Sequence, residues 1–185
     1  MRTEAIEKAA MYHAINDITL HGEIVIFGST FMANFPFYEL SKKYLLSNAV
    51  YNRSIRDLTL EEADEILSEC VLELKPSKIF LALGEKDVNS PSAVTVYGKI
   101  IKKIQTKLPT AKVYVLPVEN HENIPTVSEF NHKLRELCNR ADVTFLDVPN
   151  QNSSPVLLYE KLFKRLHCFF RDKHLTFAEA FALAD

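Results

Sequence analysis

The feature that most constrains this chain is the segment from Glu23 to Thr30, which reads EIVIFGST. Its unbroken apolar run is typical of a strand that is buried on both faces, as in a parallel sheet covered by helices. Gly28 then permits a sharp turn and a close approach of another group to the backbone. The segment therefore predicts a central strand whose polar end carries Ser29 and Thr30. Those two hydroxyls either take part in chemistry there or cap the turn.

Apolar runs alternate with helical patterns along the rest of the chain. We expect strands over residues 24–27, 48–52, 78–83, 112–117 and 143–147, and helices over residues 4–17, 36–46, 60–74, 91–108, 127–138, 156–166 and 176–183. Capping boxes at Thr59 with Glu62 and at Thr126 with Glu129 mark two helix starts. Strands that alternate with helices over short connections indicate right-handed βαβ units. The predicted fold class is α/β, a three-layer α/β/α sandwich around a five-stranded parallel sheet.

Length and composition narrow the class of protein. The 185 residues predict one domain over 1–185, with residues 1–20 as an N-terminal helical extension. A net charge of -2 and no dense basic cluster argue against nucleic acid as the main partner. No apolar stretch is long enough to span a membrane and the first residues lack a signal peptide's apolar core, so we expect a cytoplasmic protein without a membrane partner.

The cysteines and glycines give no sign of a cofactor. Cys70, Cys138 and Cys168 are widely spaced and include no metal-binding pair, so we expect free thiols and no metal site. Gly28 stands without the further glycines of a phosphate-binding loop, which argues against a nucleotide cofactor. The sequence does not indicate the oligomeric state.

Polar residues follow three of the predicted strands and precede the last helix. These four segments are Gly28-Ser29-Thr30, Asn52-Arg53-Ser54, Gly84-Glu85-Lys86-Asp87 and Arg171-Asp172-Lys173-His174. In open α/β sheets, ligands bind at the carboxyl ends of the strands. A hydroxyl, a histidine and a carboxylate are the groups that nucleophilic acyl transfer needs, because the hydroxyl requires a base and the base requires an orienting group. Backbone N–H groups at a glycine turn could stabilise the oxyanion.

These segments, in this order, resemble the motifs of the SGNH (GDSL-like) hydrolases, a family of esterases, lipases and deacetylases. The resemblance spans Ile24 to Ala184 and implies a flavodoxin-like parallel sheet. Family motifs Gly-Asp-Ser, Asn-Arg-Gly-Ile, Gly-x-Asn-Asp and Asp-x-x-His-Leu are matched by residues 28–30, 52–55, 84–87 and 171–175. The resemblance implies a nucleophile at Thr30 or Ser29 and a base at His174. It implies oxyanion or binding roles for Asn52, Arg53, Ser54, Gly84 and Lys86.

The motif frame is kept, but several active residues differ from the family pattern. Thr30 stands in place of the nucleophilic serine, Lys86 in place of the asparagine, and Arg171 in place of the orienting carboxylate. Ser54 replaces a glycine that supplies an oxyanion N–H. The threonine methyl group stiffens χ1 and crowds attack. Asp172 is one residue out of register with the expected carboxylate.

Two functional hypotheses follow. In the first, the chain is a divergent hydrolase that acts on a carboxylic ester or an acetylated, carbohydrate-like substrate, with Asp172 as a shifted orienting group and Lys86 as an oxyanion donor. In the second, it is a non-catalytic relative that binds a small anionic ligand drawn by Arg53, Lys86 and Arg171. A third interpretation is that the resemblance reflects the fold alone.

Overall fold

The computed structural model describes residues 3–119, 124–148 and 155–171. Within them, five strands form one sheet in the order β2-β1-β3-β4-β5, and every neighbouring pair is parallel. The strands are β1 (Ile24–Gly28), β2 (Val50–Asn52), β3 (Lys78–Ala82), β4 (Lys112–Val115) and β5 (Thr144–Phe145). The predicted α/β class with a five-stranded parallel sheet is confirmed.

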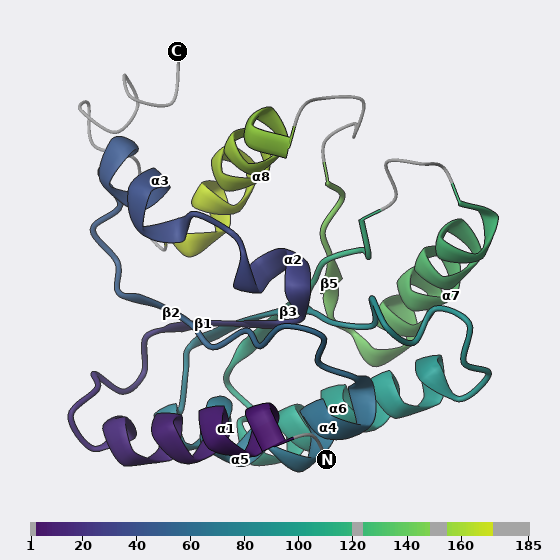
Figure 1. Cartoon of the computed structure of the whole chain (residues 1–185), viewed down its shortest axis with the longest axis horizontal. Coiled ribbons are helices and arrows are strands. Elements are labelled where there is room, and N and C mark those ends of the chain that lie inside the picture. The colour runs from purple at the N-terminus through teal and green to yellow at the C-terminus, as the bar shows by residue number, and fades with distance from the viewer. Residues whose placement is uncertain (1–2, 120–123, 149–154, 172–185) are drawn as a thin grey trace.

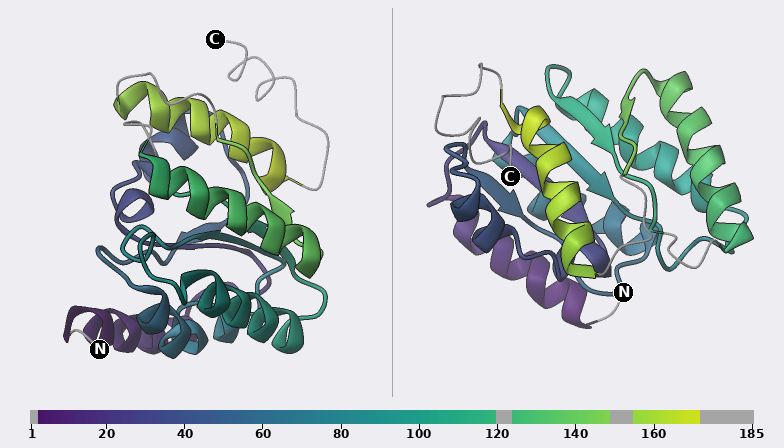
Figure 2. Two further views of the ribbon diagram at one scale, coloured as in Figure 1. Left: turned by 90° about the vertical axis from the view of Figure 1, so that its right-hand side faces the viewer. Right: turned by 90° about the horizontal axis from the view of Figure 1, so that it is seen from above.

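Helices cover both faces of the sheet (Figures 1 and 2). The first layer packs into one apolar cluster and comprises α1 (Thr3–Asn16), α4 (Leu60–Glu65), α5 (Leu67–Cys70), η1 (Leu72–Leu74), α6 (Ala93–Lys107) and α7 (Pro125–Ala141). The second layer packs into another cluster and comprises α2 (Thr30–Ala33), α3 (Phe37–Lys43) and α8 (Pro155–Phe170). The sheet is therefore the middle of three layers.

Strand β1 is buried along its whole length, which explains its unbroken apolar run. Val25 and Phe27 belong to the cluster under the first layer, whereas Ile24 and Ile26 belong to the cluster under the second. Successive side chains of a strand point to opposite faces, so a central strand between two layers needs apolar residues at every position.

One predicted helix start is confirmed and another is wrong. The Thr59 hydroxyl accepts from the Glu62 N–H at 3.3 Å, and the Glu62 carboxylate accepts from the Thr59 N–H at 3.1 Å, as a capping box requires. The box at Thr126 does not form, because α7 begins at Pro125, two residues before the predicted start, with Ile124 at the N-cap position. Proline is favoured at a first helical position, where its fixed φ suits the helix and a missing N–H costs nothing.

Helix α1 is integrated into the first layer. Ala5, Ala9 and Tyr12 are buried, and the helix packs against α5 and η1. Its small residues Ala5 and Ala9 allow this close approach. The predicted helix over residues 176–183 lies outside the described residues.

Candidate functional site

The order of the strands places a switch point at β1, since β2 lies on one side of it and β3 on the other. Ligands bind at the carboxyl ends of strands beside such a point. Gly28 ends β1 there, and it packs so closely on β3 that a Cβ atom would lie 2.8 Å from the Ala82 carbonyl oxygen. The Ser29 N–H donates to the same oxygen at 3.0 Å. Gly28 therefore allows the turn that carries Ser29 and Thr30 to pack against the end of β3.

The two hydroxyls of this turn have different surroundings. Ser29 is fully buried, and its hydroxyl donates to the Leu58 carbonyl at 3.1 Å. Thr30 is partly exposed, and its Oγ1 accepts from the Asp57 N–H at 2.9 Å. A hydroxyl that accepts one hydrogen bond still has its own proton to donate. Of the two predicted nucleophiles, Thr30 is the one that solvent reaches.

The loop after β2 is tied to the turn by Asn52. Its side-chain amide donates to the Met32 carbonyl at 2.8 Å and accepts from the Ser54 N–H at 3.1 Å. The Ser54 hydroxyl oxygen is buried without a hydrogen-bond partner among the described residues. Asn52 therefore positions this loop against α2.

Arg53 points to the first helical layer rather than to the carboxyl edge of the sheet. Its guanidinium lies 4.4 Å from the ring centroid of Tyr12, a residue of α1, and donates to Asn16 Oδ1 at 3.2 Å. The side chain is 3% exposed, and this burial lowers the pKa of Arg53. Its contacts are with α1 and with the ring of Tyr51, so the structure does not bring it to the turn at Thr30.

The loop after β3 supplies the third set of predicted residues. Gly84 has φ 102°, and a Cβ atom there would lie 2.7 Å from Phe130 Cζ, so both backbone conformation and packing require glycine. Lys86 Nζ forms an ion pair at 2.9 Å with Asp57, the residue whose N–H bonds Thr30. This ion pair brings the positive charge of Lys86 close to the Thr30 turn.

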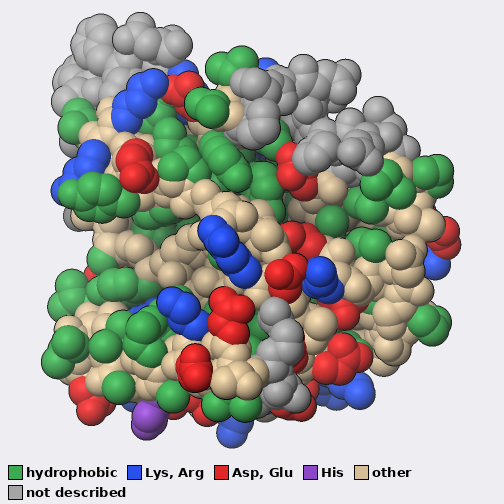
Figure 3. Space-filling model, viewed as in Figure 1, with side chains coloured by type: hydrophobic (Ala, Val, Ile, Leu, Met, Phe, Trp, Pro, Cys, Tyr) green, Lys and Arg blue, Asp and Glu red, His purple; other side chains and the backbone are tan. Residues whose placement is uncertain are grey.

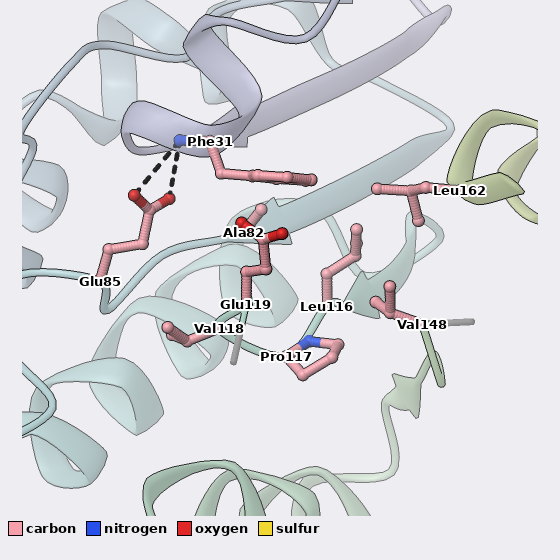
Figure 4. A pocket seen from close by; sticks show the side chains of 9 residues that line it. All are labelled: Phe31, Ala82, Glu85, Leu116, Pro117, Val118, Glu119, Val148 and Leu162. Carbon is pink, nitrogen blue, oxygen red and sulfur yellow. Dashed lines mark hydrogen bonds between the residues drawn. The ribbon is translucent and has the colours of Figure 1, made fainter. Parts of the chain in front are cut away.

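Glu85 is the residue at this site that the sequence motifs did not identify. Its two carboxylate oxygens accept from the Phe31 N–H at 3.0 and 3.2 Å (Figure 4). Burial raises the pKa of Glu85, the N–H groups of Phe31 and Thr30 lower it, and the nearby carboxylates Glu119 and Asp57 raise it. Its position, x in Gly-x-Asn-Asp, has no assigned role in the motif, so no signal in the sequence pointed to it.

A narrow apolar crevice opens beside this contact (Figure 4). Its walls are formed by Phe31, Ala82, Leu116, Pro117, Val118, Val148 and Leu162, together with the two acidic residues Glu85 and Glu119. The free space at its centre is about 10 Å³, which is roughly the room that one water molecule needs. On the face of the molecule drawn in Figure 3, acidic and basic side chains are interspersed.

Helix α8 runs antiparallel to the strands, which decides where its two ends lie. Leu162 lines the crevice, and the Phe169 carbonyl accepts from Lys78 Nζ at 2.9 Å. Lys78 is the first residue of β3, so this end of α8 lies at the amino edge of the sheet. Arg171 follows two residues later. The structure therefore places Arg171 at the edge of the sheet opposite to Thr30.

The predicted base and its orienting group, His174 and Asp172, lie outside the described residues. The described residues that line the crevice include no histidine. Nor do the described residues contain a group of three or more His, Cys, Asp or Glu side chains placed to hold a metal ion. None of the helices in the described ranges is long and apolar enough to cross a membrane.

Comparison with solved structures found several proteins of similar architecture. The chain is similar to a protein designated a platelet activating factor from Streptococcus pneumonia, with TM-score 0.76 and 19% identity over 91% of this chain and 93% of that one. It is also similar to a GDSL-like lipase from Bacteroides thetaiotaomicron, with TM-score 0.68 and 12% identity over 87% of this chain and 97% of that one.

A lipase/acylhydrolase from Enterococcus faecalis gives TM-score 0.63 and 16% identity over 82% of this chain and 98% of that one. No protein-family model and no curated protein sequence matches the chain. At these identities the likeness shows a shared fold, so the predicted resemblance to the SGNH (GDSL-like) hydrolases is confirmed at the level of the fold.

Proposed function

We propose that this protein is a divergent ester hydrolase of the SGNH type, with Thr30 as its nucleophilic hydroxyl and a short acyl group, such as acetyl, as the group transferred. The observation that carries the proposal is the contact between the Glu85 carboxylate and the Phe31 N–H, one residue from the Thr30 hydroxyl. A carboxylate oxygen is a chemical analogue of the oxyanion that forms during acyl transfer. The Glu85 carboxylate at the Phe31 N–H therefore supports an oxyanion-binding position at that N–H, beside the partly exposed Thr30 hydroxyl.

In the proposed reaction, the Thr30 oxygen attacks the ester carbonyl and the alcohol leaves with a proton. The acyl group then stays on Thr30 until water releases it. The carbonyl oxygen would take the place of Glu85 at the Phe31 N–H, and the acyl chain would enter the crevice. The small free space in that crevice favours short acyl groups over long ones.

The base for this reaction remains the predicted His174, oriented by Asp172. Arg171 lies at the edge of the sheet opposite to Thr30, and the three residues from Arg171 to His174 span at most about 11 Å. The role of His174 is therefore a separate part of the proposal, which the His174→Ala variant tests on its own.

A second candidate function is a non-catalytic relative that binds a small ligand in the same crevice. It is favoured by the hydrogen bond that already occupies the Phe31 N–H and by the ion pair of Lys86 with Asp57. Two of the three cations expected to draw an anion, Arg53 and Arg171, lie away from the crevice. Two carboxylates line it instead, so an uncharged ligand fits this candidate better than an anionic one.

The test is hydrolysis of p-nitrophenyl acetate, p-nitrophenyl butyrate and acetylated sugars. Thr30→Ala and His174→Ala are expected to reduce turnover to the rate of buffer, whereas Thr30→Ser keeps or raises it because the methyl group is removed. Ser29→Ala is expected to act mainly on stability, because the Ser29 hydroxyl is buried. Ser41→Ala, which removes an exposed hydroxyl from α3, is the matched control. Equal turnover by wild type and Thr30→Ala would contradict the hydrolase and leave the binding function.

A further inference from the structure

The two ends of the crevice are formed by different parts of the fold. Glu85 and the Phe31 N–H lie at one end, next to Thr30 in the chain. Leu162, from α8, lies at the other end, and the ring of Phe31 extends between Glu85 and Leu162 (Figure 4). An acyl group whose carbonyl oxygen binds at the Phe31 N–H therefore has an apolar path along the Phe31 ring toward Leu162.

We propose that Leu162 is a specificity-determining residue of this site, which sets the longest acyl chain that the crevice admits. The inference rests on the proposed function, because that function makes the crevice the acyl site. Leu162 acts by closing the far end of the crevice and takes no part in the chemistry at Thr30.

The crevice has little room to spare in front of Leu162. Its free space of about 10 Å³ is roughly what one water molecule needs, so even a short acyl group fills it. The Leu162 side chain is 1% exposed and belongs to the apolar cluster under the second helical layer. Because protein interiors are packed as densely as organic crystals, each methylene added to the acyl group would meet this side chain.

The neighbours of Leu162 along α8 hold this end of the crevice in place. The ring of Tyr159 lies 5.4 Å from the ring of Phe31 in α2, measured between centroids. On the other side of Leu162, the ring of Phe163 stacks on that of Tyr44, the residue after α3, at 5.5 Å. A longer acyl chain could therefore push Leu162 aside only by breaking the contacts of α8 with its layer.

Shortening the Leu162 side chain gives the expected size of the effect. Leu162→Ala removes the isopropyl group and leaves that space to the acyl chain. Burial of one methylene group changes affinity by about fourfold, so an acyl chain that buries two more of them should gain roughly tenfold or more.

The experiment measures kcat/KM for p-nitrophenyl acetate, butyrate and hexanoate. In the wild type, kcat/KM is expected to fall as the acyl chain lengthens. Leu162→Ala is expected to raise the ratio of the hexanoate value to the acetate value by about tenfold. Leu162→Val, a smaller change to the core, is expected to raise the same ratio by a smaller factor, which keeps the test open if Leu162→Ala does not fold.

Leu166→Ala is the matched control. Leu166 is also buried and lies one turn further along α8, but it is not among the described residues that line the crevice. Its truncation loosens the same helix without enlarging the crevice, so the ratio of hexanoate to acetate should stay at the wild-type value. An unchanged ratio in Leu162→Ala and Leu162→Val would overturn the inference. So would an equal rise of the ratio in Leu166→Ala.

A measurement without turnover separates the role of Leu162 from the proposed function. Binding of 1-hexanol, an uncharged chain, is measured from the methyl resonances of Leu116, which lines the crevice. Leu162→Ala is expected to bind 1-hexanol about tenfold more tightly than wild type or Leu166→Ala. Such binding without Thr30-dependent hydrolysis would support the role of Leu162 and contradict the hydrolase. Thr30-dependent hydrolysis with an unchanged chain-length ratio and unchanged 1-hexanol binding would overturn the role of Leu162 and leave the hydrolase.

Discussion

Replacing Gly28 by alanine tests the close approach of β1 and β3 on which the position of Thr30 depends. A Cβ atom at residue 28 would lie 2.8 Å from the Ala82 carbonyl oxygen and 3.0 Å from Met32 Cβ. The first of these contacts is with the backbone at the end of the central strand β3, so it cannot be relieved by rotating a side chain. The strands must separate or the turn after β1 must shift.

The expected cost follows from measured effects of overpacking. Inserting an extra methyl group into a well-packed core typically costs about 1–3 kcal/mol of the free energy of unfolding. For a chain of 185 residues, each kcal/mol corresponds to roughly 2–4 °C in the melting temperature. We therefore expect Gly28→Ala to lower the melting temperature by about 2–12 °C.

Gly98→Ala is the matched control for this prediction. Gly98 lies within α6, and its added Cβ would meet the end of the flexible Leu137 side chain at 3.3 Å. Alanine is favoured over glycine inside a helix by about 1 kcal/mol, so Gly98→Ala is expected to be neutral or stabilising. Urea denaturation gives both free energies. A Gly28→Ala protein as stable as Gly98→Ala would refute the argument that the close approach requires glycine.

Three other predictions concern titration, capping and thiols. Burial raises the pKa of Glu85, so the native state binds more protons than the unfolded state between the two pKa values, and the free energy of unfolding should fall as the pH rises through that window. Urea titrations should show a larger fall in wild type than in Glu85→Gln, in which Asp87, whose pKa burial also raises, still contributes; parallel curves would contradict the prediction. Thr59→Ala should cost about 1 kcal/mol by removing the capping box, whereas Thr106→Ala on the exposed face of α6 should change stability by less than about 0.5 kcal/mol. Burial raises the pKa of Cys70 to about 12 and that of Cys138 to about 11, so mass spectrometry after iodoacetamide treatment of the native protein should find only the exposed Cys168 modified, and rapid labelling of Cys70 would contradict its burial.

Local patterns determined much of the fold. The run from Ile24 to Phe27 predicted a strand covered on both faces, because only such a strand needs apolar residues at every position. The Thr59 capping box was correct because its two hydrogen bonds are made between residues three apart, whatever the rest of the chain does. The Thr126 box failed because Pro125 begins the helix before it. For α1, small residues such as Ala5 and Ala9 carry the buried face, and a hydrophobicity pattern gives them little weight.

The candidate site was predicted only in its outline. The sequence indicated that Thr30, Asn52 and Gly84 lie at or just after the carboxyl ends of strands that meet at one edge, and the structure confirms that arrangement of strands. Which side chains face the crevice was decided by tertiary contacts. Ser29 and Thr30 are neighbours in sequence, yet one hydroxyl is buried on the Leu58 carbonyl and the other is partly exposed.

Tertiary structure also decided the charge of the site. Arg53 contacts Tyr12 on the first helical layer, and the antiparallel course of α8 carries Arg171 to the opposite edge of the sheet. The Glu85 carboxylate is held in place by a hydrogen bond from the N–H of Phe31, a residue 54 positions away along the chain. The spacing of a motif indicates which residues follow a strand, because the end of a strand is set by the local sequence. It does not indicate where their side chains point, because side-chain direction depends on the elements that pack around them.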